Sequence, residues 1–156
     1  MAHRTYRYFD GEALYPFGYG LGYTTFSYSN PRVATGSKPE AGAAATISID
    51  VANTGTMAGD EVVQVYLTHL GISGAALREL KGFRRVALKP NEKQTVSFTL
   101  NARDLSVVDQ TGERKVVPGE VKVWIGGGQP VVRSGLAKPS GAETQFTITS
   151  GAAIPD

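Results

Sequence analysis

Short runs of alternating apolar and polar residues fill most of this chain, and they constrain its fold more than any other feature. The runs cover residues 46–51, 62–68, 95–100, 120–125 and 145–149. Because successive side chains of a β-strand point to opposite faces, such alternation predicts strands with one apolar and one polar face. The residues expected to face inward are Ile47, Ile49, Val51, Val63, Val65, Leu67, Val96, Phe98, Leu100, Val121, Val123, Ile125, Phe146 and Ile148.

Turn-forming residues separate these runs. They are the segments 53–55 (Asn-Thr-Gly), 89–91 (Lys-Pro-Asn), 111–112 (Thr-Gly) and 118–119 (Pro-Gly), all of residue types that favour turns. A further strand is expected around residues 83–88, and residues 101–105 are expected to form one helical turn capped by Asn101. Many short strands with almost no helix predict an all-β, immunoglobulin-like two-sheet sandwich.

The absence of cysteine narrows both the fold and the chemistry. With no Cys among 156 residues, the antibody-type disulfide is excluded, so the fibronectin type III-like branch of the sandwich fits better. Cysteine nucleophiles and cysteine zinc sites are excluded as well. Cysteine content does not fix the compartment, and the first residues do not read as a signal peptide. A periplasmic, secreted or cytoplasmic parent protein therefore stays open.

The charge pattern favours no polyanionic partner. The formal net charge is +2, and the densest basic pair, Arg84-Arg85, lies on an expected strand. Nucleic-acid binding needs basic residues gathered on one face, and a solvated strand explains this pair better. No apolar run approaches the roughly 20 residues that a membrane helix needs. We therefore expect neither nucleic acid nor membrane as a partner.

Residues 1–32 form an aromatic arm with a different pattern. They hold nine of the fourteen aromatic residues of the chain, interleaved with Gly and Pro that interrupt any regular helix or long strand. Only the segment 25–28 resembles the start of a strand. The expected organisation is an arm over residues 1–32, a sandwich over 33–150 and a tail over 151–156.

The arm carries more apolar surface than the sandwich can absorb. Each aromatic side chain can bury roughly 150–250 Å², while the alternating runs already supply a core. We expect the arm to lie over the sandwich and to offer its rings to a missing domain or to a second copy of the chain, as a homodimer. The interface candidates are Tyr6, Tyr8, Phe9, Tyr15, Phe17, Tyr19 and Tyr23.

No catalytic or metal-binding constellation stands out. The acidic residues fall at turns and on outward strand faces, and even the adjacent Asp60 and Glu61 are expected to be solvated surface charges pointing to opposite faces. His3 lies near the terminus and His69 ends an expected strand, where an edge or loop position is more plausible than a base. The glycines at 126–128 precede no helix and so form no phosphate site. We expect no catalytic residue, no metal and no cofactor.

Two further aromatic residues, Tyr66 and Trp124, fall on the polar phase of their strands. Exposed flat rings can stack on sugars, and large exposed apolar groups also mark contacts between domains. A domain contact is favoured over sugar binding. Partial burial beneath long neighbours such as Lys122 is a close competitor.

Several motifs, in order, resemble the C-terminal fibronectin type III-like domain of glycoside hydrolase family 3. They are the segments 4–9 (Arg-Thr-Tyr-Arg-Tyr-Phe), 14–26 (Leu-Tyr-Pro-Phe-Gly-Tyr-Gly-Leu-Gly-Tyr-Thr-Thr-Phe), 53–55, 59–66 (Gly-Asp-Glu-Val-Val-Gln-Val-Tyr), 79–83 (Glu-Leu-Lys-Gly-Phe) and 88–90. The resemblance covers about residues 4 to 126. The segment 126–130 and the tail depart from it.

The resemblance implies a parent enzyme of the β-glucosidase or β-xylosidase type, retaining and exo-acting, and the opening motif leans toward β-xylosidase. In this family the nucleophilic Asp and the acid/base Glu lie in upstream domains, and the nucleophile's Ser-Asp-Trp setting does not occur here. The expected function is thus a non-catalytic accessory domain that stabilises absent catalytic domains and borders the substrate cleft. The alternative is an autonomous carbohydrate-binding module using Trp124 or Tyr66, with polysaccharide as a weak partner.

Overall fold

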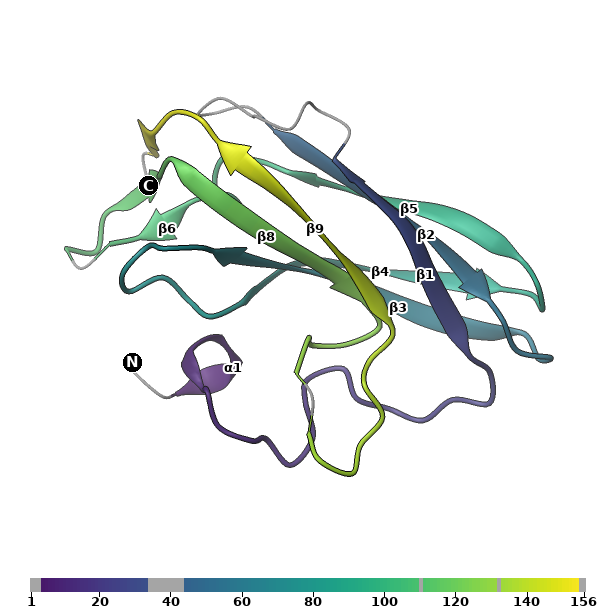
Figure 1. Ribbon diagram of the computed structural model, residues 1–156. Coiled ribbons are helices and arrows are strands. Elements are labelled where there is room, and N and C mark those ends of the chain that lie inside the picture. The colour runs from purple at the N-terminus through teal and green to yellow at the C-terminus, as the bar shows by residue number, and fades with distance from the viewer. Residues whose placement is uncertain (1–3, 34–43, 110, 132, 155–156) are drawn as a thin grey trace.

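Two antiparallel sheets pack face to face in the computed structural model, which describes residues 4–33, 44–109, 111–131 and 133–154 (Figure 1). The first sheet has the order β1-β2-β5, with strands Phe26–Val33, Ala45–Asn53 and Lys93–Leu100. The second has the order β4-β3-β8-β9, with strands Glu79–Leu88, Gly59–His69, Gly119–Gly126 and Gly141–Ile148. The expected all-β sandwich of fibronectin type III-like kind is confirmed.

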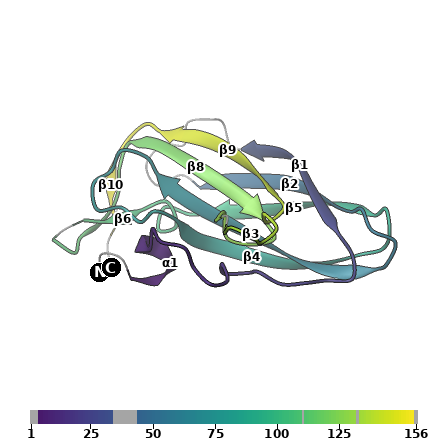
Figure 2. The same ribbon diagram turned by 60° about the horizontal axis from the view of Figure 1, so that its bottom comes forward.

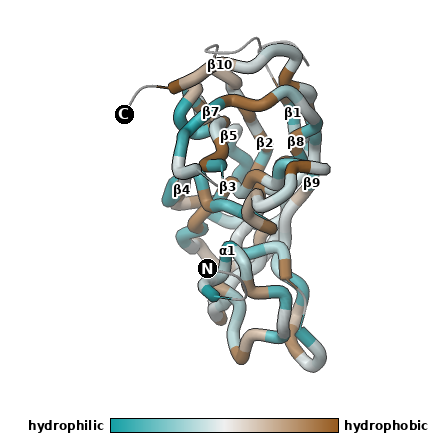
Figure 3. The backbone as a smooth tube through the Cα atoms, turned by 90° about the vertical axis from the view of Figure 1, so that its left-hand side faces the viewer, coloured by the Kyte–Doolittle hydropathy of each residue, from teal (hydrophilic) through white to brown (hydrophobic). Residues whose placement is uncertain are grey.

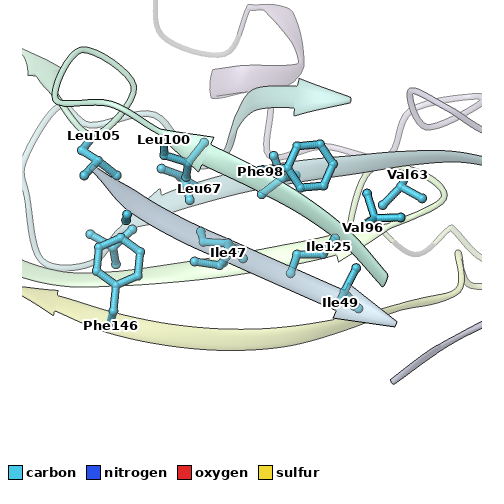
Figure 4. Close-up of a cluster of buried hydrophobic side chains, with 14 of the residues drawn as sticks. Ile47, Ile49, Val63, Leu67, Val96, Phe98, Leu100, Leu105, Ile125 and Phe146 are labelled. Carbon is cyan, nitrogen blue, oxygen red and sulfur yellow. The ribbon is translucent and has the colours of Figure 1, made fainter. Parts of the chain in front are cut away.

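The core lies between the two sheets and is made by the residues that the alternation predicts. All fourteen expected inward residues are buried, with at most 9 % of their surface exposed. Ile47 and Ile49 of β2 face Ile125 of β8 across this layer (Figure 4). Each fully buried aliphatic or aromatic side chain contributes about 1.5–3 kcal/mol, so this shared layer holds the sheets together.

The expected helical turn after β5 is present. The N–H of Leu105 donates to the carbonyl oxygen of Asn101 at 3.1 Å. The side-chain Oδ1 of Asn101 accepts the N–H of Asp104 at 3.0 Å, as a cap does. This turn leads into β6 (Val107–Val108), which pairs with β7 (Arg114–Val116).

The C-terminal segment is more than a tail. Ala152–Ala153 form β10, which pairs with β7 and completes a small third sheet of order β10-β7-β6. The sequence expectation of a tail from 151 onward is corrected here. Two alanines are too few to show a period, so the pairing could only be seen in three dimensions.

The arm also ends earlier than expected, because β1 begins at Phe26. Residues 26–32 therefore belong to the sandwich, with Phe26 opposite Asn53 and Tyr28 opposite Val51 in β2. An irregularity in β1 hides this strand from a pattern search. Pairing breaks between Ser29 and Arg32, where Asn30 takes a positive φ of 52° and Pro31 has no N–H to donate.

The remainder of the arm forms a layer outside the sandwich. It contains α1 (Thr5–Tyr8) followed by an irregular segment, and it runs past β4, β3 and the loop between β8 and β9 (Figures 1 and 2). The end-on view separates this layer clearly from the strands above it (Figure 3). Among the described residues, no helix is long and apolar enough to cross a membrane.

Candidate docking surface

The first anchor of the arm is α1, which is held against the start of β4. Main-chain contacts fix it: the N–H of Leu77 donates to the carbonyl of Arg7 at 2.8 Å. The N–H of Leu80 donates to the Tyr6 hydroxyl at 3.2 Å, and Arg78 Nη1 donates to the Tyr6 carbonyl at 3.2 Å. Two of these bonds satisfy the carbonyls of Arg7 and Tyr6 in a four-residue helix that could not persist alone.

A charged cluster reinforces this anchor through a bulge in β4. The register between β3 and β4 shifts opposite Val65 and Tyr66, which leaves Lys81 as the extra residue. Lys81 Nζ lies 3.0 Å from a carboxylate oxygen of Glu79, whose other oxygen pairs with Arg7. Burial lowers the pKa of Lys81 to about 8. The bulge thus aims a cation at the carboxylate that holds α1.

The second anchor clips the middle of the arm to the loop between β8 and β9. Phe17 and Gln129 exchange two hydrogen bonds: the Phe17 N–H donates to Gln129 Oε1 at 3.1 Å, and the Gln129 N–H donates to the Phe17 carbonyl at 2.9 Å. The Ser134 N–H donates to a Glu12 carboxylate oxygen at 2.9 Å, and Arg133 donates to the Leu14 carbonyl. Arm and loop therefore form one structural unit.

The third anchor is Asn53, the last residue of β2, which holds the C-terminal end of the arm. This residue has no exposed surface. Its Nδ2 donates to the carbonyls of Met57 at 2.8 Å and Leu88 at 3.0 Å. Its Oδ1 accepts the Thr24 hydroxyl at 2.6 Å and the Gly55 N–H at 3.0 Å. One buried amide thereby ties the arm, the β2–β3 turn and the end of β4 together.

Tyr66 is buried beneath the arm and Trp124 beneath the β8–β9 loop, so the expectation that they are exposed is wrong. Tyr66 is 1 % exposed and Trp124 is 7 % exposed. The Tyr6 ring meets Tyr66 edge-on at 6.4 Å. Trp124 Nε1 donates to the Gly128 carbonyl at 2.9 Å. Gly141 leaves the space that the indole fills, since a Cβ there would lie 2.4 Å from it.

A layer outside the second sheet accounts for this error. Sequence alternation assigns both rings to the outward face, and they do lie on it. The arm, a segment far away in the sequence, packs on Tyr66, whereas the irregular β8–β9 loop directly after its own strand packs on Trp124. Neither segment leaves a period that a local pattern could reveal. Because neither ring is available to a sugar, the carbohydrate-binding alternative loses the two residues on which it was built.

The interface candidates divide into two groups. Tyr6 and Tyr8 are half-buried; Tyr6 packs on the chain's own sheet, and the Arg7 guanidinium lies 5.6 Å from the Tyr8 ring centre. The other five are exposed, at 36 % for Phe9, 67 % for Tyr15, 56 % for Phe17, 37 % for Tyr19 and 95 % for Tyr23. The arm thus has an inner side directed at the sandwich and an outer side rich in rings.

Four exposed apolar residues that sequence reasoning did not select extend this outer side. Leu14 is 72 % and Leu21 is 91 % exposed in the arm, and on the outward face of β3 and β4 Val62 is 41 % and Phe83 is 71 % exposed. For Val62 and Phe83, the sequence signal was a large apolar residue at a strand position expected to face solvent. We call the following set the apolar face: Leu14, Tyr15, Phe17, Tyr19, Leu21, Tyr23, Val62 and Phe83. Exposed apolar patches of this kind mark interaction sites.

A groove of about 900 Å³ opens between the arm, the β8–β9 loop and the edge of β3. Rings of Phe17, Tyr19 and Phe83 line it together with the acidic residues Asp60 and Glu61. Glu61 is half-buried, which corrects the expectation of a solvated surface charge. The Tyr28 hydroxyl donates to Glu61 Oε1 at 2.5 Å, and burial raises the pKa of Glu61.

The two histidines were the remaining polar candidates. His3 lies outside the described residues. His69 is buried at the end of the central strand β3, not at an edge or in a loop, and burial lowers its pKa to about 4. Both of its ring nitrogens lack a partner among the described residues. Within that same part of the chain, no group of three His, Asp or Glu residues could hold a metal ion.

Comparisons with known proteins match this architecture. The model of the fibronectin type III-like domain family matches residues 61–129. A β-xylosidase of Formosa agariphila is 43 % identical over 122 residues, which is 78 % of this chain and 17 % of that enzyme. A periplasmic β-glucosidase of Salmonella typhimurium is 39 % identical over 134 residues, covering 84 % of this chain and 17 % of that enzyme.

Among solved structures, β-glucosidase 3B from Thermotoga neapolitana, in complex with α-D-glucose, superposes with a TM-score of 0.76 at 30 % identity. The match covers 92 % of this chain and 18 % of that enzyme. The chain therefore spans about a sixth of the length of the curated relatives it matches.

Proposed function

Because this chain belongs to the fibronectin type III-like domains of glycoside hydrolase family 3, we propose that it is a non-catalytic accessory domain of a retaining, exo-acting β-glycosidase. In this proposal the arm is the interdomain junction. The catalytic domains lie on its outer side, and the domain stabilises them and borders their substrate cleft. The observation that carries the proposal is the apolar face, whose rings are held in place by three anchors and still lie exposed.

The energetics support docking. Burying an exposed aromatic or aliphatic side chain is worth about 1.5–3 kcal/mol, so three residues of the apolar face would contribute about 4–9 kcal/mol. A domain on the same polypeptide avoids most of the entropy that two free proteins lose on association. The anchors also fix the arm's main chain in advance, which lowers the ordering cost further.

Complementation of a relative tests the proposal. The β-xylosidase of Formosa agariphila would be expressed without its matching C-terminal region, together with this chain on a second plasmid. We expect soluble, active enzyme that co-purifies with the chain, and no turnover of nitrophenyl glycosides by the chain alone. The relative's own C-terminal region serves as the positive control. If that control restores the enzyme and this chain does not, or if the chain alone turns over substrate, the proposal fails.

Point variants locate the contact. Leu21→Ser removes one of the most exposed residues of the apolar face, while Leu70→Ser changes a residue that is 39 % exposed after β3 and outside that face. We expect Leu21→Ser to reduce the yield of complex and Leu70→Ser to leave it near the unchanged level. Equal effects would place the contact elsewhere.

A further inference from the structure

Glu61 is a half-buried carboxylate without a cation. Its Oε1 accepts the Tyr28 hydroxyl at 2.5 Å, and no Lys or Arg of the described residues forms an ion pair with it. Its neighbour Asp60, which is more exposed, is paired with Arg85. Taking a carboxylate out of water is costly unless a cation or several donors compensate. Of these two neighbouring carboxylates, the more buried Glu61 is thus the one without a cation.

Several large apolar side chains share the groove with Glu61. Tyr19, Leu21 and Phe83 line the same groove, and its volume of about 900 Å³ has room for several side chains. Two amide side chains nearby are already used within the chain. Gln64 accepts the Tyr66 hydroxyl at 2.6 Å and donates to the Gly127 carbonyl at 3.3 Å, and Gln129 is bonded to Phe17. Asp60, Arg133 and Lys138 also line the groove. Asp60 pairs with Arg85, Arg133 pairs with Glu12, and Lys138 is exposed to solvent. Glu61 is therefore the half-buried acidic group of the groove that has no ion pair among the described residues.

This combination favours a polypeptide over a sugar. A sugar ring presents several hydroxyls that need several polar partners, whereas one unpaired carboxylate beside aromatic rings suits a single basic side chain with apolar neighbours. A guanidinium or ammonium group would supply the missing charge, and its methylene stem would lie on the rings. The groove thus offers charge and apolar complementarity to a basic segment.

We propose that the groove receives a segment of the catalytic part of the glycosidase whose Arg or Lys side chain pairs with Glu61 while adjacent apolar side chains pack on Phe83 and Tyr19. This inference rests on the proposed accessory function and names the chemistry of the partner at that surface.

The first test uses the full chain alone with a small basic probe. Nitrogen-15-labelled chain is titrated with acetyl-arginine amide and, in parallel, with acetyl-glutamine amide. We expect the arginine probe to shift the amide resonances of Glu61 and Gly127 and the glutamine probe to leave them in place. Glu61→Gln removes the charge and keeps an acceptor for Tyr28, so it should abolish the shifts. Asp60→Asn makes the same charge change on the Arg85-paired neighbour and should keep them.

The second test uses the complementation complex with the Formosa agariphila enzyme. We expect Glu61→Gln to weaken the complex at least about tenfold and Asp60→Asn to change it less than about threefold. Thermal melts of both variants check that the chain stays folded. A complex that forms but is indifferent to Glu61→Gln overturns this inference and leaves the accessory function intact, whereas no complex with the unchanged chain overturns both.

A carbohydrate is the competing occupant. The unchanged chain and Glu61→Gln are run in native gels containing xylan or soluble glucans. We expect no retardation of either protein. Retardation of the unchanged chain that disappears in Glu61→Gln would assign the groove to a sugar and overturn the basic segment.

Discussion

Replacing Asn53 with alanine should destabilise the chain more than any surface change. The substitution removes four hydrogen bonds, to Met57 O, Leu88 O, Thr24 Oγ1 and Gly55 N. Water can replace part of them, since Met57 is 55 % exposed and Thr24 is half-buried. The Leu88 carbonyl bond is buried and has no such replacement.

The expected loss follows from these bonds. A typical internal hydrogen bond contributes about 1 kcal/mol net, and a buried group left without a partner costs about 1–3 kcal/mol. Counting the Leu88 carbonyl as stranded and the rest as partly hydrated gives about 3 kcal/mol for Asn53→Ala. For a domain of this size, this corresponds to a fall in Tm of about 6–12 °C.

Urea unfolding followed by tryptophan fluorescence measures this loss, because Trp124 is buried and is the chain's single tryptophan. Thr54→Ala is the matched control: Thr54 bonds only to Thr25 at the surface, so its loss should stay below about 0.5 kcal/mol. If Asn53→Ala costs less than about 1 kcal/mol, or no more than the control, the amide does not anchor the arm and the reasoning is wrong.

Three further predictions concern the β8–β9 loop, the loss of stability at acidic pH and self-association. Trp124→Phe removes the donor to the Gly128 carbonyl and should cost about 1–3 kcal/mol in urea unfolding followed by circular dichroism; a neutral result would mean that this bond does not help to hold the loop. Hydrogen bonds from Asn30 and Thr95, joined by Lys93, hold the pKa of Asp50 well below its usual range. This group therefore stabilises the fold above the ordinary Asp pKa and loses that contribution as the pH falls. Asp50→Asn should be less stable near neutral pH, and its Tm should fall less steeply between pH 7 and pH 2 in thermal melts. An unchanged fall of Tm with pH would exclude Asp50 as its cause. The uncovered apolar face should make the isolated chain dimerise with rising concentration in sedimentation experiments, and Tyr23→Ser should reduce this; a strict monomer at high concentration would contradict it.

The sheets could be predicted because their signal is local. Val63, Val65 and Leu67 alternate with polar or outward residues over a few positions, and that period alone fixes which face is buried. The turn at Asn53 follows from residue type in the same way. None of these inferences needs knowledge of a distant segment.

The layer outside the second sheet could not be predicted in this way. Tyr66 lies on the outward phase, and its burial depends on Tyr6, sixty positions earlier in the chain. Glu61 was expected to be a solvated surface charge, and its half-burial depends on Tyr28 and on the β8–β9 loop. Long-range packing of an irregular segment leaves no period in the sequence, so only the aromatic content of the arm gave a hint.

The inner and outer sides of the arm explain why this sandwich would dock onto another domain through the arm and not through the bare sheet. Beyond Tyr66 and Trp124, the outward face of β3 and β8 carries groups such as Thr68 and Lys122, and Lys122 pairs with Glu143 on β9. Desolvating such a face against another domain would be costly. The arm and the β8–β9 loop bonded to it cover the two rings that the sheet cannot leave exposed, and the arm presents a new apolar surface directed outward. Main-chain and side-chain hydrogen bonds already hold the arm at three anchors, so a partner domain would meet an ordered surface.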